Sequence, residues 1–451
     1  MKRHLIFGRF GAGDRQDVPV AQGEVATRLP FVHSKRRLDH GISDMLDDLA
    51  KLNLFPTEVA VDLIVLAAHV QAADTHLSRQ TEAQDGWTRE IRIVVPVSEP
   101  TLWNSSLPLL ERLLSFLTGD RWVVGFRARP TGFEHIVSPK PPQLVHAPFD
   151  SLALFSGGLD SLIAAIDCLE QNKTPLLVSH AGDGATSDSQ STLFQGLKRN
   201  YPTRDFNRMR IWMDFRGWEV KGVDPEKSSR GRSFLFFAVG VLAGTALEGN
   251  FTLRAPENGL IALNVPLDPL RLGAFSTRTT HPFYIARWNE LLAKLGISGR
   301  IENPYWDKTK GEMVASCGNP SLLASLAPKS MSCSSPTKGR WLGRAAGHCG
   351  FCLPCLIRRA ALRGTDRTSY MLSNLNARDL STRKAQGQQV RSFQFAIERI
   401  HAKPGLASLF IHKPGPLTDE SPERRAALAD VYRRGLEEVA RLLTGVSTTP
   451  D

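Results

Sequence analysis

The chain has 451 residues and a formal net charge of +11, and hydrophobic residues make up 42% of it, which excludes a disordered composition. No apolar run approaches the about 18 residues of a membrane span, and the first residues make a poor signal peptide. We therefore expect a protein of about three domains without membrane contact. Six cysteines are too few for a disulfide scaffold, and their clustering late in the chain points to a metal site in the cytoplasm. The charge leaves a nucleic-acid partner open, although a solvated basic surface is the commoner cause.

Residues 1–148 predict an N-terminal α+β module without a catalytic signature. The first residues predict a strand and a turn, and further on we expect helices at Ile42–Leu52, Thr57–Leu77 and Thr101–Leu117, with strands at Arg89–Val97 and Arg121–Arg127. The module would position a partner or substrate, or would only extend the fold. The proline-rich segment Ser138–Gln143 is the expected linker to the next domain.

Residues 149–363 change to alternating strands and helices. We expect strands at Leu152–Phe155, Pro175–Ser179, Arg208–Phe215 and Gly259–Val265, and helices after the first strand and at Ser187–Asn200, Gly231–Leu247 and His281–Leu295. This alternation predicts an α/β fold with a doubly wound parallel sheet. Ligands of such sheets bind beyond the carboxyl ends of the strands, where the strand order reverses. Segments Ser156–Ser161, His180–Asp183 and the residues after Val265 should therefore meet in one crevice.

The turn after the first of these strands reads Ser156-Gly157-Gly158-Leu159-Asp160-Ser161. Two adjacent glycines let the backbone turn sharply and approach a ligand closely. The amides at the start of the following helix point into one spot, with the positive end of the helix dipole behind them. This arrangement predicts a phosphate or pyrophosphate site that is not a Walker A loop. A serine-capped helix after a strand is the alternative.

Four late cysteines predict a structural Zn²⁺ site: Cys333, Cys349, Cys352 and Cys355. Two overlapping CxxC turns can place three sulfurs on one side of an ion, and Cys333 would complete a tetrahedron. A CxxC redox pair, an iron–sulfur cluster, and His348 in place of one cysteine are the alternatives. We expect Cys168 to be a buried apolar residue and Cys317 to lie outside the cluster, with competition between Cys317 and Cys333 as the alternative.

The cysteine segment is also strongly basic. Between Lys329 and Arg367 there are eight lysines or arginines and one acid, Asp366. We expect most of them to be solvated, and Arg358 to point inward, where a guanidinium group could orient a carboxylate or phosphate.

Residues 364–451 predict a C-terminal helical extension. The expected helices cover Asp379–Ile400 and Ser421–Leu443. The last one carries four arginines and two glutamates, which we expect to form a solvated face, with a docking surface as the alternative: Arg424, Arg425, Arg433, Arg434, Glu437 and Glu438.

The SGGLDS loop and the cysteine cluster together resemble QueC, the 7-cyano-7-deazaguanine synthase family of PP-loop ATP pyrophosphatases, over about residues 150 to 365. Ser228–Ser233 is similar to the PGRN segment of that family, and Lys308–Glu312 to its KTKAE segment. Where the family has a Ser-Gly-Tyr-Pro-Asp pattern, this chain has STRTTHP, with Arg278 and His281. The resemblance implies the PP-loop fold, which is adenine nucleotide alpha hydrolase-like.

The resemblance also implies roles for individual residues. Asp160 would help to bind Mg²⁺ or fix the loop, and Lys310 and Arg232 would meet phosphate charge, which makes these three the expected catalytic set. Arg278, His281 and Arg358 would bind the substrate. The ATP site would comprise Ser156, Gly157, Gly158, Leu159, Asp160, Ser161, His180, Gly231 and Arg232.

The implied reaction begins with the carboxylate of 7-carboxy-7-deazaguanine, which displaces pyrophosphate from ATP and becomes an acyl-adenylate. Ammonia then gives an amide, and a second ATP helps to dehydrate it to a nitrile. The added modules resemble a longer branch, the QatC proteins of the bacterial Qat anti-phage system. That likeness implies immunity and a place beside an ATPase, a small partner protein and a TatD-like nuclease, so the acceptor could be a protein amine.

Two other functions are compatible with the sequence. A PP-loop enzyme that modifies tRNA would use the basic cysteine lobe to hold RNA. A scaffold that binds nucleotide without turnover is the other alternative function. A homodimer is compatible with each of these functions.

Overall fold

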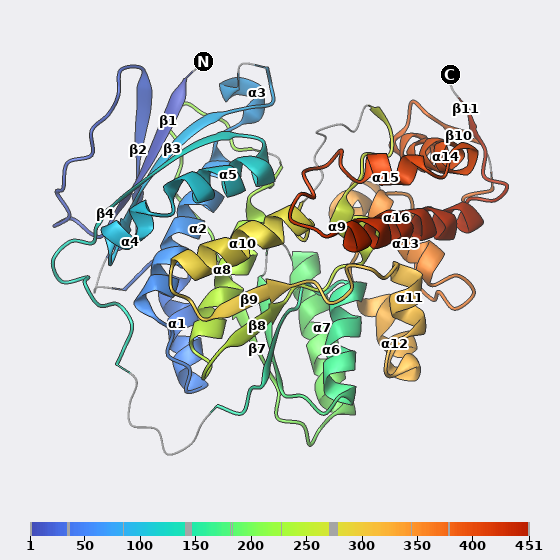
Figure 1. Ribbon diagram of the computed structural model, residues 1–451, viewed down its shortest axis with the longest axis horizontal. Coiled ribbons are helices and arrows are strands. Elements are labelled where there is room, and N and C mark those ends of the chain that lie inside the picture. Colours follow the sequence, from blue (N-terminus) through green and yellow to red (C-terminus); the bar gives the residue numbers. More distant parts are fainter. Residues whose placement is uncertain are drawn as a thin grey trace.

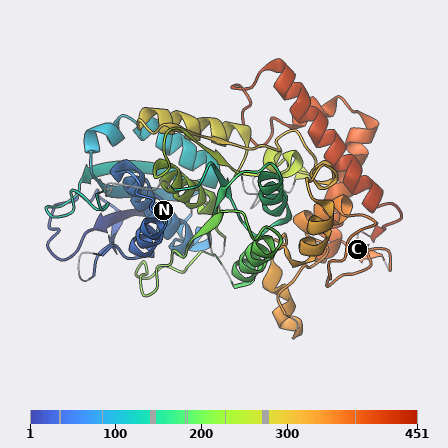
Figure 2. The same cartoon turned by 90° about the horizontal axis from the view of Figure 1, so that it is seen from below.

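The computed structural model describes residues 2–33, 37–83, 85–139, 147–180, 182, 184–226, 228–269, 278–343, 345–377 and 379–449. Figures 1 and 2 show three parts side by side: an N-terminal sheet with its helices, a central sheet, and a C-terminal group of helices. Most of the expected linker, from Lys140 onward, lies outside the described residues. Within the described residues, no helix combines the length and apolar character needed to cross a bilayer.

The N-terminal sheet contains β1 (Arg3–Arg9), β2 (Glu24–Pro30), β3 (Glu90–Val97) and β4 (Arg121–Ala128) in the order β2-β1-β3-β4. All of its neighbouring strands pair in parallel. Parallel neighbours need crossover connections. A loop connects β1 to β2, and the later connections run through α1 (Ile42–Lys51), α2 (Glu58–His76), α3 (Arg79–Glu82), α4 (Pro100–Asn104) and α5 (Leu107–Thr118). The expected α+β class is therefore wrong for this part, which is α/β.

The expected helix Thr101–Leu117 is interrupted. It divides into α4 and α5, and Pro108 lies in the first turn of α5. Proline is tolerated there because the first-turn amides have no partner within the helix, but it cannot continue a helix from the preceding turn.

The central sheet contains β5 (Ser151–Leu154), β6 (Pro175–His180), β7 (Asn207–Ile211), β8 (Phe251–Arg254) and β9 (Gly299–Glu302) in the order β7-β6-β5-β8-β9. Every neighbouring pair is parallel, which confirms the expected parallel α/β sheet. The helices between these strands are α6 (Leu159–Glu170), α7 (Gly184–Asn200), α8 (Arg232–Thr245) and α10 (Pro282–Lys294). The chain leaves β5 toward β6 and later returns to β8 on the other side, so the strand order reverses between β5 and β8.

One expected strand is wrong. Gly259–Val265 is not a strand, because residues Gly259–Leu263 form the short helix α9. The side chain of Asn258 accepts a hydrogen bond from the amide of Ile261 (3.2 Å) and so caps this helix. The strand of the sheet is the preceding segment β8.

The N-terminal and central sheets share one apolar core. A continuous cluster of buried side chains runs from Ile6 in β1 to Ile301 in β9. Helix α2 lies at its centre and packs against α8, with apolar residues buried around most of its surface. The two sheets are thus joined by packed side chains.

The remaining elements lie on the other side of the central sheet. They are α11 (Lys310–Ala315), α12 (Pro320–Leu326), α13 (Leu353–Ala361), α14 (Ala385–Ala402), α15 (Leu406–Phe410) and α16 (Pro422–Leu442), with a short parallel pair, β10 (Leu380–Ser381) and β11 (Thr448–Thr449). Helices α11 and α12 pack against α6 and α7, and the later helices form a separate core with α9. Helix α16 packs against α13, α14 and α9, as Figure 1 shows. The extension therefore covers the cysteine segment and the short helix α9.

Candidate nucleotide site and cysteine centre

The SGGLDS loop connects β5 to α6 at the edge of the sheet where the strand order reverses. Gly157 has φ of 82°, and a Cβ at this position would lie 3.0 Å from Cγ of Gln190. Only glycine fits this conformation and this space. The Ser156 hydroxyl accepts a hydrogen bond from the amide of Gly158 (3.3 Å), and the Ser161 hydroxyl donates to the carbonyl of Gly158 (3.1 Å).

Asp160 and Lys310 form a buried ion pair, although 150 positions separate them in the sequence. Oδ1 of Asp160 accepts from Nζ of Lys310, and its Oδ2 accepts from the backbone amide (3.1 Å) and side-chain amide (2.8 Å) of Asn258. Both carboxylate oxygens are thus engaged. Asp160 ties the loop to the starts of α9 and α11, which favours the loop-fixing role over that of a Mg²⁺ ligand.

The start of α11, which carries Lys310, is held by the C-terminal helix α16. Thr309 and Glu312 form a capping box, in which the amide of Thr309 donates to Oε2 of Glu312 (2.9 Å). Glu438 accepts from the Thr309 hydroxyl and from the amide of Gly311 (3.1 Å), and Arg434 pairs with Glu312. The expectation of a solvated face on α16 is wrong for Arg434 and Glu438.

His180 lies beside the loop, and Arg232 lies near His180 and Gly182. Nε2 of Gln190 donates to the carbonyls of both Ser156 (3.3 Å) and His180 (3.1 Å), so this side chain links the loop to the end of β6. Burial, with a smaller contribution from the charge of Arg232, lowers the pKa of His180 to about 4. Among the described residues, the buried Nε2 of this uncharged ring has no hydrogen-bond partner, which suits contact with a bound ligand.

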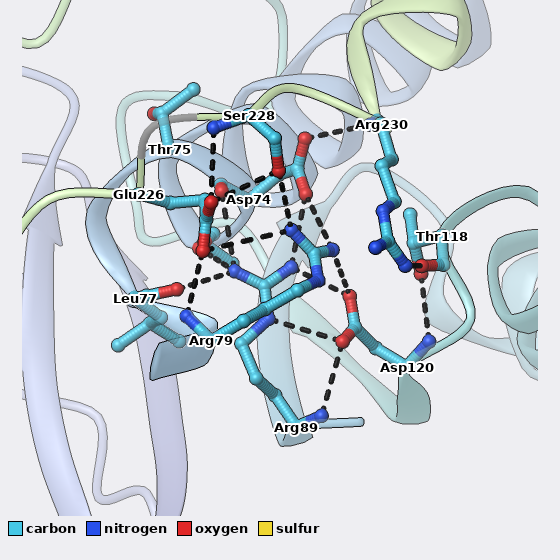
Figure 3. A network of polar contacts seen from close by, with 12 residues as sticks. Asp74, Thr75, Leu77, Arg79, Arg89, Thr118, Asp120, Glu226, Ser228 and Arg230 are labelled. Carbon is cyan, nitrogen blue, oxygen red and sulfur yellow. Dashed lines mark hydrogen bonds and ion pairs between the residues drawn. The ribbon is translucent and has the colours of Figure 1, made fainter. Parts of the chain in front are cut away.

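Gly231, expected in the nucleotide site, is anchored to the N-terminal part of the chain. Its amide donates to Oδ2 of Asp74 (2.7 Å). Figure 3 shows the buried network around Asp74, in which Arg79 and Arg89 each donate to Asp74 (3.1 and 2.9 Å) and to Asp120 (2.7 and 2.6 Å). Burial acts to raise the pKa of Asp120, but the hydrogen bonds and charges of the two arginines lower it overall. The segment that precedes α8 is therefore fixed by the N-terminal module.

Replacing Asp74 with asparagine should lower the free energy of unfolding by about 3 kcal/mol, because two buried guanidinium groups then share less negative charge. Urea unfolding followed by circular dichroism measures the change. The control is Asp48→Asn, which removes an exposed pair with Lys51 and should cost no more than about 1 kcal/mol. Equal losses in the two variants would contradict a structural role for the network.

The four expected cysteines come together. Their sulfurs all lie within 4.8 Å of one another, and the pairs Cys333–Cys352 and Cys349–Cys355 are each 3.9 Å apart. A tetrahedron with Zn–S bonds of about 2.3 Å needs sulfurs about 3.8 Å apart, so the cluster could hold a zinc ion. The amide of Cys352 donates to Sγ of Cys349 (3.3 Å), a contact that stabilises a thiolate.

The other candidate ligands lie outside this cluster. Nε2 of His348 accepts from the amide of Ser332 (3.2 Å). Sγ of Cys168 accepts from Arg254 (3.5 Å), and burial raises the pKa of the Cys317 thiol to about 11. The structure therefore favours the expected four cysteines over a set that includes His348.

The cysteine segment forms one side of the loop. The amide of Met331 donates to the carbonyl of Gly157 (2.8 Å), and the amide of Leu159 donates to the hydroxyl of Ser332 (3.4 Å). Arg358 points inward and is fully buried, as expected, and donates to Ser330 (2.7 Å), Ser332 (3.3 Å), the carbonyl of Ala327 (2.5 Å) and Thr368 (3.0 Å). It therefore braces the segment that touches the loop, and its substrate role stays a prediction.

Arg278 and His281 face the N-terminal module. Arg278 donates to the carbonyl of Phe116 (2.6 Å), and His281 caps α10 by accepting from the amide of Phe283 (3.2 Å). Burial and the nearby Arg278 lower the pKa of His281 to about 3, so its ring is uncharged. In the part of the chain that the structure describes, no hydrogen bond joins either side chain to residues 156–161. Their role in binding a substrate stays a prediction.

Sequence reasoning missed Gln190 and Glu257. Glu257 follows β8 and precedes Asn258, so it lies on the other side of the strand reversal from the loop. Oε2 of Glu257 accepts from the Thr280 hydroxyl (2.5 Å). The sequence signal for Glu257 is its place shortly after the strand β8, because polar residues that follow a parallel strand line the ligand crevice.

A cavity of about 1150 Å³ lies between α9, the cysteine segment and α14. Its lining is mostly apolar, with Ile261, Leu353 and Phe393 among the contributing side chains. It is adjacent to the helix that Asn258 caps, and the C-terminal extension closes one of its sides.

The chain matches no protein-family model, no curated protein and no solved structure. Its own geometry identifies it as an α/β protein with two parallel sheets of four and five strands and a four-cysteine cluster that could hold a zinc ion.

Proposed function

We propose that the chain is an ATP-dependent QueC-like enzyme that adenylates the carboxylate of a 7-deazaguanine acid and passes the acyl group to an amine. The observation that carries this proposal is the SGGLDS loop at the strand reversal, tied through Asp160 to Lys310. Backbone amides at the start of α6 suit the pyrophosphate end of ATP. The buried Nε2 of His180, without a protein partner among the described residues, supports a ligand at the same place.

The side chains have distinct tasks in this proposal. Ser156, Gly157, Gly158 and Ser161 hold pyrophosphate, and Arg232 and Lys310 neutralise negative charge. ATP supplies AMP as the leaving group that turns an unreactive carboxylate into an acyl donor, and Mg²⁺ accompanies the phosphates. The contribution of the protein is mainly positioning and charge neutralisation. Zinc, held by the four cysteines, has a structural role because four protein ligands leave it no open position.

The acceptor is ammonia or an amino group of a partner protein from the same anti-phage system. The large cavity beside α9 supports an acceptor bigger than ammonia, because ammonia needs no such space. Intact-mass measurement of the partner, with and without enzyme and ATP, tests this part of the proposal. An unchanged mass would count against a protein acceptor.

A tRNA-modifying enzyme is the second candidate. It is favoured by exposed basic side chains on the cysteine lobe, namely Lys338, Arg340, Arg363 and Arg367. Such residues would contact the phosphates of RNA and make its binding depend on salt concentration.

Pyrophosphate release from ATP separates the candidates. We expect release to depend on 7-carboxy-7-deazaguanine and to be unaffected by tRNA, with no release when both are absent. Release that requires tRNA would favour the second candidate. Binding of ATP without release under any of these conditions would indicate a scaffold.

A further inference from the structure

Glu257 is held rigidly at the strand reversal. Its amide donates to Oδ1 of Asn303 (3.2 Å), and its carbonyl accepts from Nδ2 of the same side chain (2.7 Å). The buried Thr280 hydroxyl fixes one carboxylate oxygen. The next residue, Asn258, binds Asp160 of the loop. This carboxylate is thus placed beside the Asp160–Lys310 pair by contacts on both its main chain and its side chain.

The charges that face Glu257 come from two helices. Asp160 of α6 raises its pKa and Lys310 of α11 lowers it, while burial has the largest effect and the Thr280 hydrogen bond opposes it. Together they raise the pKa of Glu257 to about 7. A carboxylate with such a pKa can take a proton near neutral pH and release it again, which an ordinary surface glutamate does poorly.

We propose that Glu257 is the general base of the acyl-transfer step, an assignment that rests on the proposed function. The amine acceptor is protonated at neutral pH and must lose a proton before its nitrogen can attack. The Glu257 carboxylate accepts that proton, and the neutral nitrogen then forms a bond to the acyl carbon. A second proton passes from this nitrogen to water as the amide forms. The bond from this carbon to the phosphate oxygen breaks, and AMP leaves with the electron pair. Lys310 stabilises the charge that develops on the phosphate.

The experiment compares two nucleophiles in wild-type protein and in Glu257→Gln. Glutamine keeps an oxygen that can accept from Thr280 but cannot take a proton. With ammonium chloride as acceptor, we expect transfer by Glu257→Gln to fall by about 100-fold or more. Hydroxylamine is already uncharged at neutral pH, so its transfer to a hydroxamate should fall by less than about 5-fold. Glu302→Gln, which weakens ion pairs with Arg254 and Arg300 at the far end of the sheet order from β5, is the matched control and should behave as wild type.

The pH dependence gives a second measurement. In wild-type protein, transfer to ammonia should rise as pH increases through about 7, because the Glu257 carboxylate is then unprotonated. This inflection should be lost in Glu257→Gln and kept in Glu257→Asp. Equal losses with ammonia and hydroxylamine, or no loss with either, would overturn the assignment. If wild-type protein shows no pyrophosphate exchange that depends on 7-carboxy-7-deazaguanine, the proposed function is contradicted, and the assignment of Glu257 is contradicted with it.

Discussion

Replacing Lys310 with methionine should lower the free energy of unfolding by about 3–5 kcal/mol. It should also reduce the pyrophosphate release that depends on 7-carboxy-7-deazaguanine by about 1000-fold or more. The loss of stability follows because the buried carboxyl group of Asp160 loses its cationic partner. The loss of activity follows because the loop loses one of its anchors and the phosphates lose a positive charge. Urea unfolding and a pyrophosphate assay measure the two effects separately.

A double variant separates stability from chemistry. Asp160→Asn combined with Lys310→Met removes both charges and should recover most of the lost stability, while activity stays low. Lys308→Met is the matched control two positions away, because the side chain of Lys308 contacts the Ser316 hydroxyl (3.1 Å) and the ring of Tyr305 and is not bound to Asp160. A double variant as unstable as the sum of the single ones would contradict a direct ion pair.

Features that depend on neighbouring residues could be predicted from the sequence. The loop needs two adjacent glycines between a strand and a helix, and all of that information lies within about twenty residues. The cysteine cluster is likewise encoded by short spacings, and only Cys333 is supplied from a distance. Both predictions rest on short motifs, because such a motif allows only a few backbone conformations.

Features that depend on tertiary contacts could not be predicted in the same way. Gly259–Val265 is a short apolar run, which periodicity alone cannot assign to a strand or a helix. The cap from Asn258 favours a helix, and the glycine at 259 is required because a Cβ there would lie 2.3 Å from the carbonyl oxygen of Trp306. The true strand, β8, has only four residues.

The direction of strand pairing is also absent from local patterns. The edge strand β2 has only one buried residue and a weak alternation. The sequence of the N-terminal part therefore indicates helices and strands, but not that the strands pair in parallel. The contact of Glu438 with the Lys310 segment is of the same kind. Nothing in an amphipathic, charged helix indicates which of its polar residues will meet a distant capping box.

Removing one cysteine ligand should strongly reduce both zinc binding and ATP binding. Cys349→Ser should reduce the zinc content from about one ion per chain to almost none, and ATP binding should weaken strongly. Cys317→Ser is the control, because this thiol is buried elsewhere and should leave the zinc content unchanged. Elemental analysis measures the metal, and calorimetry with a non-hydrolysable ATP analogue measures nucleotide affinity without turnover.

The physical link between metal and nucleotide is the segment before Cys333. Ser332 accepts from the amide of Leu159, and Met331 donates to Gly157, so two contacts of the loop depend on where this segment lies. His348 and Arg358 hold the same segment, and His348 directly precedes the ligand Cys349. Loss of zinc should therefore release the loop even where the central sheet stays folded. Full nucleotide affinity in a zinc-free Cys349→Ser protein would show that the loop keeps its shape without the cysteine centre, and would contradict this link.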